Sequence, residues 1–258
     1  MASETVRAPS WLRLLLEYRA VHELGAYYMA RPLLALAPPG DGHPVMVLPG
    51  FVAGDRSTAP LRGYLRERRY AAHGWGLGRN MGPIRHFQEQ ARRRLLALNH
   101  TSGRKVSLIG WSLGGIYARE IARAHPEAVR SVITLGSPFA HNPKANNAWR
   151  LYELTSGDKI DAWQAEWLAQ SQEPLPVPST AIYSQSDGIA AWQCCVQPAG
   201  PLSESIEVDS SHCGLGHNPL ALYAIADRLA EPEGRWRPFQ RVGLHRLLYP
   251  APRPYPTD

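Results

Sequence analysis

Ser112 stands between glycines in the stretch VSLIGWSLGGIYARE, residues 106–120. The apolar run before it predicts a strand and the run after it predicts a helix, so the serine occupies a sharp turn that needs small neighbours. A serine exposed in such a turn can serve as a nucleophile. The plain alternative is a glycine-rich turn, including the phosphate-binding kind, but the chain has neither a Gly-x-Gly-x-x-Gly motif nor a Walker lysine.

A serine hydroxyl is a poor nucleophile at neutral pH, so it needs a histidine to accept its proton and a carboxylate to orient that histidine. Asp187 follows the apolar run STAIYSQ (179–185), and His212 follows SIEVDS (205–210). Because functional groups gather at the carboxyl ends of parallel strands, both are expected beside Ser112. We predict Ser112 as nucleophile, Asp187 as acid and His212 as base.

Two other residues compete for these roles. Asp209 stands three positions before His212, but it lies within the predicted strand, and its side chain is expected to point away from the site. His217 precedes the run NPLALYAIADRLA, so packing or capping near Asn218 is its favoured role. Asp187 and His212 are therefore preferred.

Attack by the serine creates an oxyanion that needs two backbone donors. One is the amide of Leu113, the residue after the nucleophile. The other is expected from the segment LPGFVAG (48–54), where Gly50 lets the chain turn closely past the site and Phe51 supplies its amide. The plain alternative for this segment is a Pro-Gly turn.

The elements that position these residues alternate along the chain. Strands are expected at 44–50, at the start of 71–83, and at 105–110, 129–136, 179–185 and 205–210, and helices over 58–70, 84–103, 112–124 and 219–230. Several strands are apolar throughout, so the pattern predicts a parallel sheet covered on both faces. The Pro-rich end, 249–258, is expected to be a tail or a surface wrap.

Length, composition and net charge limit the kinds of partner that the chain is expected to bind. The 258 residues are expected to form one domain with one core. The net charge is +6 and the pI is near 9.4, but the arginines scatter without interleaved aromatics, so nucleic-acid binding is not expected. The basic cluster RERR (66–69) is expected on a solvated helix face, and attraction to acidic lipid headgroups is left open.

Residues 1–43 are expected to form an N-terminal helical extension. The run WLRLLL is short and contains an arginine, so neither a signal peptide nor a spanning segment is predicted. The expected location is cytoplasmic, with peripheral membrane contact left open. Apolar residues recur at helical spacing and are expected to pack on the body in preference to a membrane surface. These residues are Leu12, Leu15, Leu16, Ala20 and Val21.

Three cysteines cannot form a disulfide framework. The loops that carry the acid and the histidine are nevertheless expected to converge, which brings the pair Cys194 and Cys195 toward Cys213. We predict one bridge, between Cys195 (or Cys194) and Cys213. Reduced thiols are the alternative, and the redox compartment decides between the two.

The motifs LPGF, GWSLGG, SDGI and SHCGLGHNP occur in this order between residues 44 and 220. With them the chain resembles the α/β-hydrolase superfamily, and within it the small bacterial lipases and esterases. The resemblance implies an α/β-hydrolase fold with a parallel sheet of about six strands flanked by helices, and no metal or organic cofactor. It implies the same site residues: Ser112, Asp187 and His212 as the triad, with Phe51 and Leu113 as oxyanion donors.

Residues 137–178 carry apolar bulk where this fold commonly places a cap over the site. The cap is expected to form an acyl pocket for medium-chain or lipid-like esters. The plain alternative is an ordinary packed helical insertion. The side chains predicted to line the pocket are Trp149, Tyr152, Trp163 and Trp167.

The predicted function is hydrolysis of carboxylic esters through an acyl-enzyme. One alternative is an acyltransferase that uses the same triad, and another is a noncatalytic lipid- or protein-binding module that keeps the fold. The sequence leaves the natural ester and the oligomeric state open.

Overall fold

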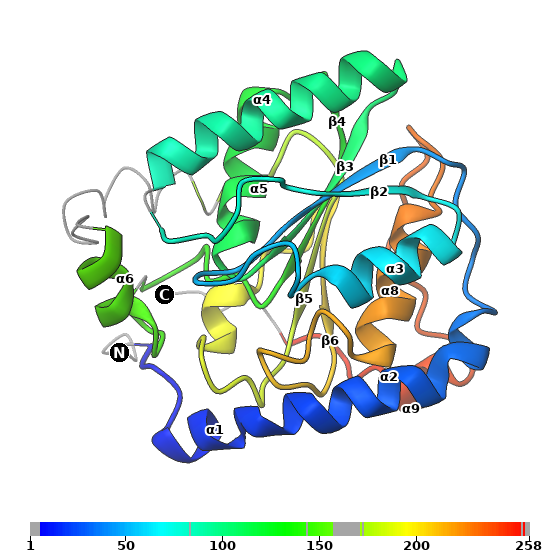
Figure 1. Cartoon of the computed structure of the whole chain (residues 1–258). Coiled ribbons are helices and arrows are strands. Elements are labelled where there is room, and N and C mark those ends of the chain that lie inside the picture. Colours follow the sequence, from blue (N-terminus) through cyan, green and yellow to red (C-terminus); the bar gives the residue numbers. More distant parts are fainter. Residues whose placement is uncertain are drawn as a thin grey trace.

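The structure is a computed structural model that describes residues 6–82, 84–142, 144–156, 171, 173–253 and 255. Six strands in these ranges form one sheet in the order β2-β1-β3-β4-β5-β6 (Figure 1). The strands are β1 (Pro44–Leu48), β2 (Ala71–Gly74), β3 (Val106–Trp111), β4 (Val129–Leu135), β5 (Ser179–Tyr183) and β6 (Ser203–Glu207). Every neighbouring pair is parallel, which confirms the predicted parallel sheet of about six strands.

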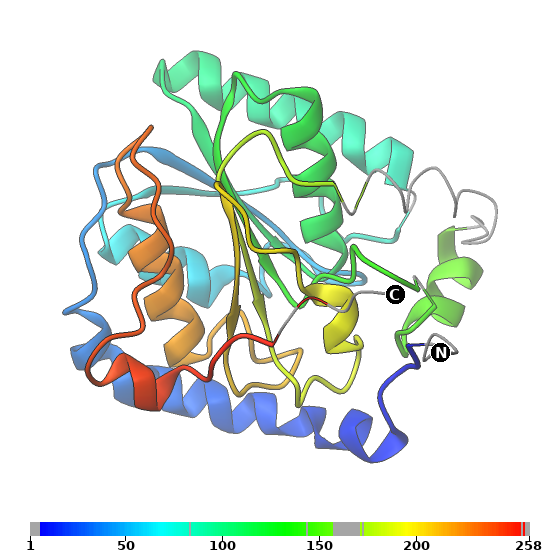
Figure 2. The ribbon, with the colours of Figure 1, turned by 180° about the vertical axis from the view of Figure 1, so that it is seen from behind.

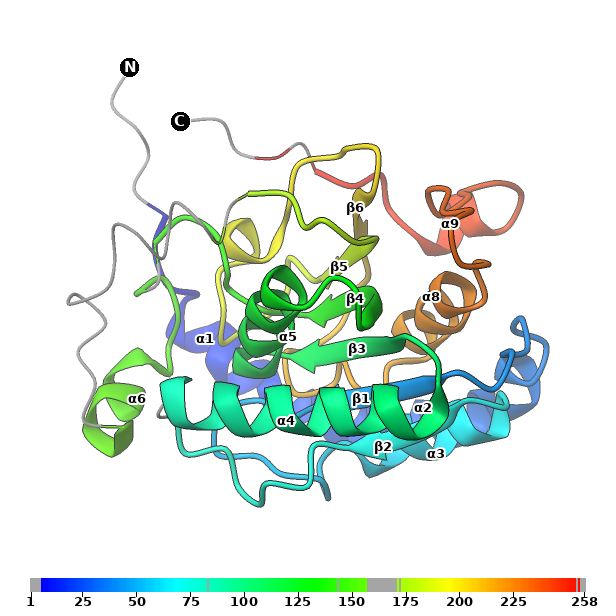
Figure 3. The ribbon, with the colours of Figure 1, turned by 90° about the horizontal axis from the view of Figure 1, so that it is seen from above.

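Helices cover both faces of the sheet. Helices α4 and α5 pack on one face, while α3 and α8 cover the other and α2 packs against α8 (Figures 1 and 3). The helices over the sheet are α2 (Ala20–Leu34), α3 (Ala59–Glu67), α4 (Ile84–Ser102), α5 (Leu113–Ala124) and α8 (Pro219–Leu229). This arrangement explains why β1 and β3 are buried at every residue, as strands covered on both faces must be.

Side chains of β1 alternate between the two apolar layers of the core. Val45 and Val47 pack with the residues of α3 and α8, whereas Met46 and Leu48 pack with those of α4 and α5. The strand therefore fixes both layers, and its carboxyl end delivers the following loop to the edge of the sheet.

The first helical segment runs along one side of the molecule, below the loops that follow β5 and β6 (Figures 1 and 2). It consists of α1 (Trp11–Leu15), a 3₁₀ turn η1 (Leu16–Arg19) and α2. The expectation that Leu12, Leu15, Leu16 and Val21 pack on the body is wrong, because these side chains are exposed, and Ala20 is half-buried. Further along α2, Tyr27 and Leu34 do join the core.

The polar residues of this segment face the body instead. Glu17 and Glu23 accept hydrogen bonds from backbone amides of the loops after β5 and β6. A buried backbone amide without a partner is costly, so amides at this position select carboxylates on the inner face. The outer face is left to the apolar residues.

Three shorter helices and the C-terminal segment complete the described chain. They are α6 (Trp149–Ser156), the 3₁₀ helix η3 (Trp192–Cys195) and α9 (His245–Leu248). After α9, Tyr249 is buried and its hydroxyl donates to the Leu220 carbonyl at 2.9 Å, and the Arg253 amide donates to the Tyr183 hydroxyl at 2.8 Å. None of the helices within the described ranges has both the length and the apolarity that crossing a bilayer requires.

Candidate active site

Ser112 occupies the turn between β3 and α5, with φ 52° and ψ −122°. Residues other than glycine rarely adopt a positive φ, so this backbone is strained. The Ser112 amide holds the turn by donating to the Leu135 carbonyl at 2.8 Å. The turn is also tight, since a Cβ added to Gly110 would lie 2.2 Å from the Gly115 Cα. The glycines therefore allow a turn that presents Ser112 at the carboxyl edge of the sheet.

Asp187 and His212 meet at this edge from the loops that follow β5 and β6. The His212 Nδ1 lies 2.6 Å from the Asp187 Oδ2, and both side chains are buried. The other carboxylate oxygen of Asp187 accepts from the amides of Ile189 at 2.8 Å and Ala190 at 2.7 Å. The carboxylate is thus fixed with one oxygen directed at the imidazole.

The electrostatics of His212 suit a proton acceptor whose cation can be stabilised. Burial acts to lower the pKa of His212, but the charge of Asp187, its hydrogen bond and the charge of Glu17 together raise that pKa above its usual value. An Asp carboxylate on Nδ1 also fixes the proton there, which leaves Nε2 as the acceptor.

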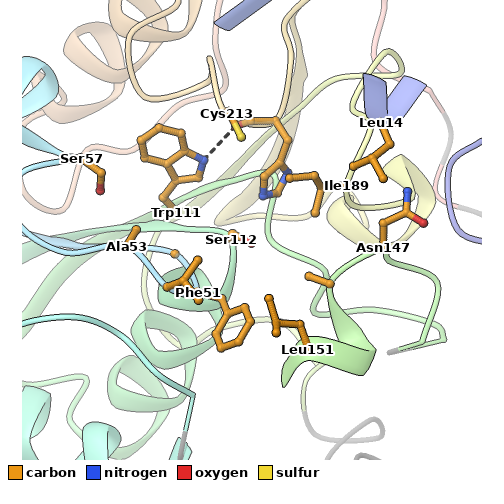
Figure 4. Close-up of a pocket in the computed structure, with 14 residues that line it drawn as sticks. Leu14, Phe51, Ala53, Ser57, Trp111, Ser112, Asn147, Leu151, Ile189 and Cys213 are labelled. Carbon is orange, nitrogen blue, oxygen red and sulfur yellow. Dashed lines mark hydrogen bonds between the residues drawn. The ribbon is translucent and has the colours of Figure 1, made fainter. Parts of the chain in front are cut away.

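Trp111 connects the serine turn to the histidine loop. Its indole Nε1 donates to the His212 carbonyl at 3.0 Å, the bond drawn in Figure 4. The sequence pattern alone predicts no role for Trp111. The available signal was its position directly before Ser112, because a buried indole N–H usually requires a partner.

A cavity of about 470 Å³ contains both Ser112 and His212 in its wall, whereas Asp187 contacts His212 from outside the cavity. Across the described ranges, no three His, Cys, Asp or Glu side chains gather so that they could hold a metal ion. The cavity is mainly apolar, and its wall comes from α1, the loops after β1, β5 and β6, the Ser112 turn and the start of α6 (Figure 4). It consists of Leu14, Gly50, Phe51, Val52, Ala53, Ser57, Trp111, Ser112, Asn147, Ala148, Leu151, Ile189, His212 and Cys213.

The two predicted oxyanion donors flank Ser112. A Cβ added to Gly50 would lie 3.2 Å from the Ser112 Cβ, so the loop after β1 passes beside the serine and carries Phe51 into the cavity wall. Leu113 is the first residue of α5. Within the described part of the chain, neither the Phe51 amide nor the Leu113 amide donates a hydrogen bond to another protein group. Both amides are available to a ligand.

Two of the four aromatic residues predicted to line an acyl pocket lie in the described ranges, and neither lines this cavity. Tyr152 is buried and packs edge-on against Phe51, with ring centroids 5.8 Å apart. The face of α6 that meets the cavity carries Leu151, so Trp149 and Tyr152 lie on neighbouring faces of the helix. The other two residues, Trp163 and Trp167, lie outside the described residues.

The rival candidates have other partners. Strand β6 ends at Glu207, so Asp209 lies in the following loop and not within the strand as expected; its exposed carboxylate accepts from the Ser186 hydroxyl at 2.5 Å. The His217 Nε2 lies 2.9 Å from the Ala20 carbonyl oxygen. Asp187 and His212 thus bond to each other, whereas Asp209 and His217 bond to other groups.

The predicted disulfide is wrong, because Cys194, Cys195 and Cys213 are all free. The thiols of Cys194 and Cys195 are buried and donate to the carbonyls of Asn142 and Ala191, whereas Cys213 lines the cavity. Burial, followed by the charge of Glu17, raises the pKa of Cys213 to about 12. The Cys213 thiol therefore stays protonated at neutral pH.

A second Ser–His–Asp array lies at the amino ends of the strands. The His43 Nε2 is 2.8 Å from the Ser107 Oγ, and its Nδ1 is 2.5 Å from the Asp41 Oδ1. Asp41 also accepts from Arg104 and Arg130. Ser107 and His43 are fully buried, and burial lowers the pKa of His43 to about 4 although Asp41 opposes the shift. A substrate cannot reach this serine, so the array ties β1 to β3.

Comparisons with known proteins agree with this fold. A model of the alpha/beta hydrolase fold matches residues 48–177. Homoserine O-acetyltransferase from Thermus thermophilus is 37% identical over 68 residues, which are 26% of this chain and 18% of that protein. Serine hydrolase BPHL from Mus musculus is 30% identical over 108 residues, which are 38% of this chain and 37% of that protein. The matches thus span well under half the length of these curated relatives.

Solved structures show the same fold at low sequence identity. Lipase B from Aspergillus fumigatus superposes with a TM-score of 0.56 at 16% identity, over 75% of this chain and 54% of that chain. The mature lipase BlEst2 from Bacillus licheniformis gives a TM-score of 0.55 at 15% identity, over 76% and 95%. A monoacylglycerol lipase from Paleococcus ferrophilus gives 0.53 at 13% identity, over 75% and 96%.

Proposed function

Since the chain belongs to the α/β-hydrolase family, we propose that it is a carboxylic ester hydrolase that works through a serine acyl-enzyme. One observation carries the proposal. Ser112 stands on a strained turn in the wall of an apolar cavity that it shares with His212, and Asp187 holds His212 through a 2.6 Å hydrogen bond. These are the parts that an activated serine requires.

In the first half of the reaction, the Ser112 Oγ attacks the ester carbonyl carbon while His212 Nε2 takes the hydroxyl proton. The carbonyl oxygen becomes an oxyanion and accepts hydrogen bonds from the amides of Phe51 and Leu113. The tetrahedral intermediate then breaks its bond to the alkoxy oxygen, and His212 gives the proton to that oxygen. The alcohol leaves, and the acyl group remains on Ser112.

In the second half, a water molecule gives a proton to His212 and attacks the acyl carbon. The new tetrahedral intermediate uses the same two amides, and its collapse releases the carboxylic acid while the proton returns to Ser112. During both halves the Asp187 carboxylate stabilises the His212 cation without taking its proton.

The cavity supports apolar acyl groups, in the medium-chain or lipid-like range, as the substrate class. Its wall is mainly apolar, and an acyl chain beside Phe51, Leu151 and Ile189 would leave water as it enters. We further propose that the predicted insertion 137–178 covers the site through α6, since α6 contributes Leu151 to the wall. Residues 157–170 of this insertion lie outside the described residues. The acyl-binding side chains in this proposal are those of the wall and not Trp149 or Tyr152.

A fluorophosphonate probe tests the proposal directly, because such probes phosphonylate activated serines. The protein is treated with the probe, digested and mapped by mass spectrometry. We expect modification at Ser112 and none in a Ser112→Ala protein. Labelling at Ser107 in place of Ser112 would refute the assignment of the nucleophile. No labelling of a folded protein would refute it as well and would favour a noncatalytic binding module.

An acyltransferase is the second candidate, because one curated relative is a homoserine O-acetyltransferase. Both reactions form the same acyl-enzyme and differ in whether water or an alcohol accepts the acyl group. The partition is measured by adding alcohols, homoserine included, to a p-nitrophenyl ester assay and quantifying acid and new ester. Ester hydrolysis predicts acid as the main product at millimolar alcohol, whereas dominant ester would identify a transferase.

Contact with an anionic lipid surface also belongs to the proposal. The outer face of α1, η1 and α2 is apolar and exposed, the chain is basic, and Leu14 continues this face into the cavity wall. Co-sedimentation with phosphatidylcholine vesicles containing phosphatidylserine tests it, with Trp11→Ser and Val21→Ser combined as the weakened variant. Equal sedimentation of both proteins would refute the lipid contact, as would a wild type that dimerises through this face.

A further inference from the structure

Glu17 joins the two loops that carry the proposed acid and base. Its Oε1 accepts from the backbone amides of Gly188 at 2.8 Å and His212 at 2.9 Å, and its Oε2 accepts from the amide of Cys213 at 2.9 Å. Gly188 follows Asp187 directly. The Glu17 carboxylate therefore accepts from the backbone of the residue next to the proposed acid and from the backbone of the proposed base. Hydrogen bonds from amides to an ionised carboxylate are among the stronger ones in proteins.

Glycines allow the N-terminal segment to lie directly on both loops. A Cβ added to Gly188 would lie 2.2 Å from the Arg13 carbonyl oxygen, and one added to Gly214 would overlap the Glu23 carboxylate. Any side chain at Gly188 would therefore push α1 and η1 away from the acid loop. The close approach of the segment is built into the sequence of the loops it contacts.

Two neighbouring residues repeat this arrangement. The Glu23 Oε1 accepts from the Ser211 amide at 2.8 Å, and its Oε2 accepts from the Ser210 hydroxyl at 2.7 Å. The Arg19 guanidinium donates to the carbonyl of Ser186 at 3.1 Å. Thus the helical segment bonds to the residues directly before and after Asp187 in one loop, and to those directly before and after His212 in the other.

We propose that Glu17 is a positioning residue, which fixes the acid loop to the histidine loop so that Asp187 and His212 keep their alignment toward Ser112. The N-terminal segment from α1 to α2 is then part of the active-site framework. This inference rests on the proposed function. It adds Glu17 to the site, although neither the sequence pattern nor the chemistry of the triad predicts a role for this residue.

The position of Glu17 gives it an electrostatic effect that a purely structural contact lacks. The charged groups that face His212 are Asp187 and Glu17, and both raise its pKa against the effect of burial. Cys213 faces Glu17, Asp187 and Glu23, and these charges add to burial in raising the pKa of its thiol. Removal of the Glu17 charge should therefore lower both pKa values.

The test compares Glu17→Gln and Glu17→Asp with a matched control, Glu67→Gln. Glu67 pairs with Arg31 of α2, so the control also removes a carboxylate that holds this helical segment, at a place remote from the cavity. The steady-state kcat and KM for p-nitrophenyl butyrate are measured across the titration of His212, and thermal unfolding verifies that each variant is folded.

Glu17→Gln turns an NH₂ group toward at least one amide donor, so the loops lose alignment. We expect kcat at the pH plateau to fall about ten- to hundredfold with little change in KM, because small misplacements of catalytic groups have effects of that size. The acidic limb of kcat/KM should move to lower pH. Glu17→Asp keeps the charge but is one methylene short, so kcat should fall while the limb stays near its wild-type position. Glu67→Gln should match wild type.

Alkylation of Cys213 by iodoacetamide supplies a readout that needs no turnover, with the buried Cys194 and Cys195 as internal references. Glu17→Gln should speed alkylation of Cys213, and Glu67→Gln should not. An active wild type whose Glu17→Gln variant keeps kcat, pH limb and Cys213 reactivity would overturn the positioning role alone. An inactive, probe-resistant wild type would overturn the proposed function, whatever the alkylation rates.

Discussion

Replacement of Asp187 by asparagine tests the proposed mechanism most sharply, because the structure dictates how the new amide must lie. The Oδ1 of Asp187 accepts from two amides, those of Ile189 and Ala190. In Asp187→Asn an NH₂ group in that place would face two N–H donors, so the amide oxygen must occupy it. The NH₂ group then faces the Nδ1 of His212, which becomes an acceptor.

This orientation gives the imidazole the wrong tautomer. With Nδ1 accepting, the proton of neutral His212 sits on Nε2, which can no longer take the proton of Ser112. The same change of tautomer in a serine protease costs on the order of 10⁴-fold in kcat, and we expect a loss of that size here, about 5.4 kcal/mol of transition-state stabilisation. Asp187 does not line the cavity, so KM should change little.

The assay measures kcat and KM for p-nitrophenyl butyrate, together with the rate of fluorophosphonate labelling, which should fall in parallel. Asp209→Asn is the matched control, since Asp209 is the nearby rival carboxylate and its side chain is exposed. It should keep near wild-type activity. An Asp187→Asn enzyme within about tenfold of wild type would refute the tautomer argument, and a large loss in Asp209→Asn would move the acid role to that residue.

Three further predictions follow from the same site. His212→Ala should be nearly as damaging as Ser112→Ala, since triad members act as a unit, whereas His217→Ala should retain most activity; the reverse order would move the base role to His217. Because neutral His212 is the base and Asp187 raises its pKa, kcat/KM should rise with pH through a midpoint above the usual histidine value; a pH-independent rate there would contradict this role. Burial is worth about 0.8 kcal/mol per methylene, so lengthening the acyl chain from two to six carbons should raise kcat/KM by at most about two hundredfold and, with incomplete burial, about tenfold. A steady fall from acetate to octanoate would mean that the cavity does not hold the acyl chain.

The residues of the candidate site were predictable because their signals are local. Ser112 directly follows β3, and Asp187 and His212 lie in the loops that follow β5 and β6. The apolar runs of these strands are visible in the sequence, and a parallel sheet brings all carboxyl ends of its strands to one edge. The structure accordingly joins Asp187 to His212 and opens the same cavity to His212 and Ser112. Their catalytic roles stay predictions until the probe and the variants have been measured.

The orientation of the N-terminal segment was not predictable in this way. Periodicity assigns apolar residues to the inner face, and this rule fails where the surface beneath consists of backbone amides. The amides that turn Glu17 inward lie 171 and 195 positions later in the chain. No pattern within the helix contains that information, although Gly188 and Gly214 mark the places where another segment approaches closely.

The prediction that Trp149 and Tyr152 line the acyl pocket failed for a related reason. Aromatic content marks where apolar bulk lies, but it does not fix the rotation of a helix about its axis. A single position separates Leu151, which lines the cavity, from Tyr152, which packs behind Phe51. One step along a helix is a turn of about 100°, so a composition argument identifies the segment and leaves the face undetermined.

The two Ser–His–Asp arrays show which features make a serine reactive. Ser107 has a histidine at 2.8 Å that is itself bonded to Asp41, so its hydrogen-bond order is that of a triad. It lies inside a regular strand, however, where both faces are covered, and burial lowers the pKa of His43 to about 4, which makes this histidine a weak base. Ser112 lies one residue beyond the end of the same strand, on a strained turn in the wall of a cavity. The amides of Phe51 and Leu113 lie beside it, and within the described ranges neither is bonded to another protein group. Access from a cavity, together with the backbone donors proposed beside Ser112, therefore separates a candidate nucleophile from a structural hydrogen-bond network.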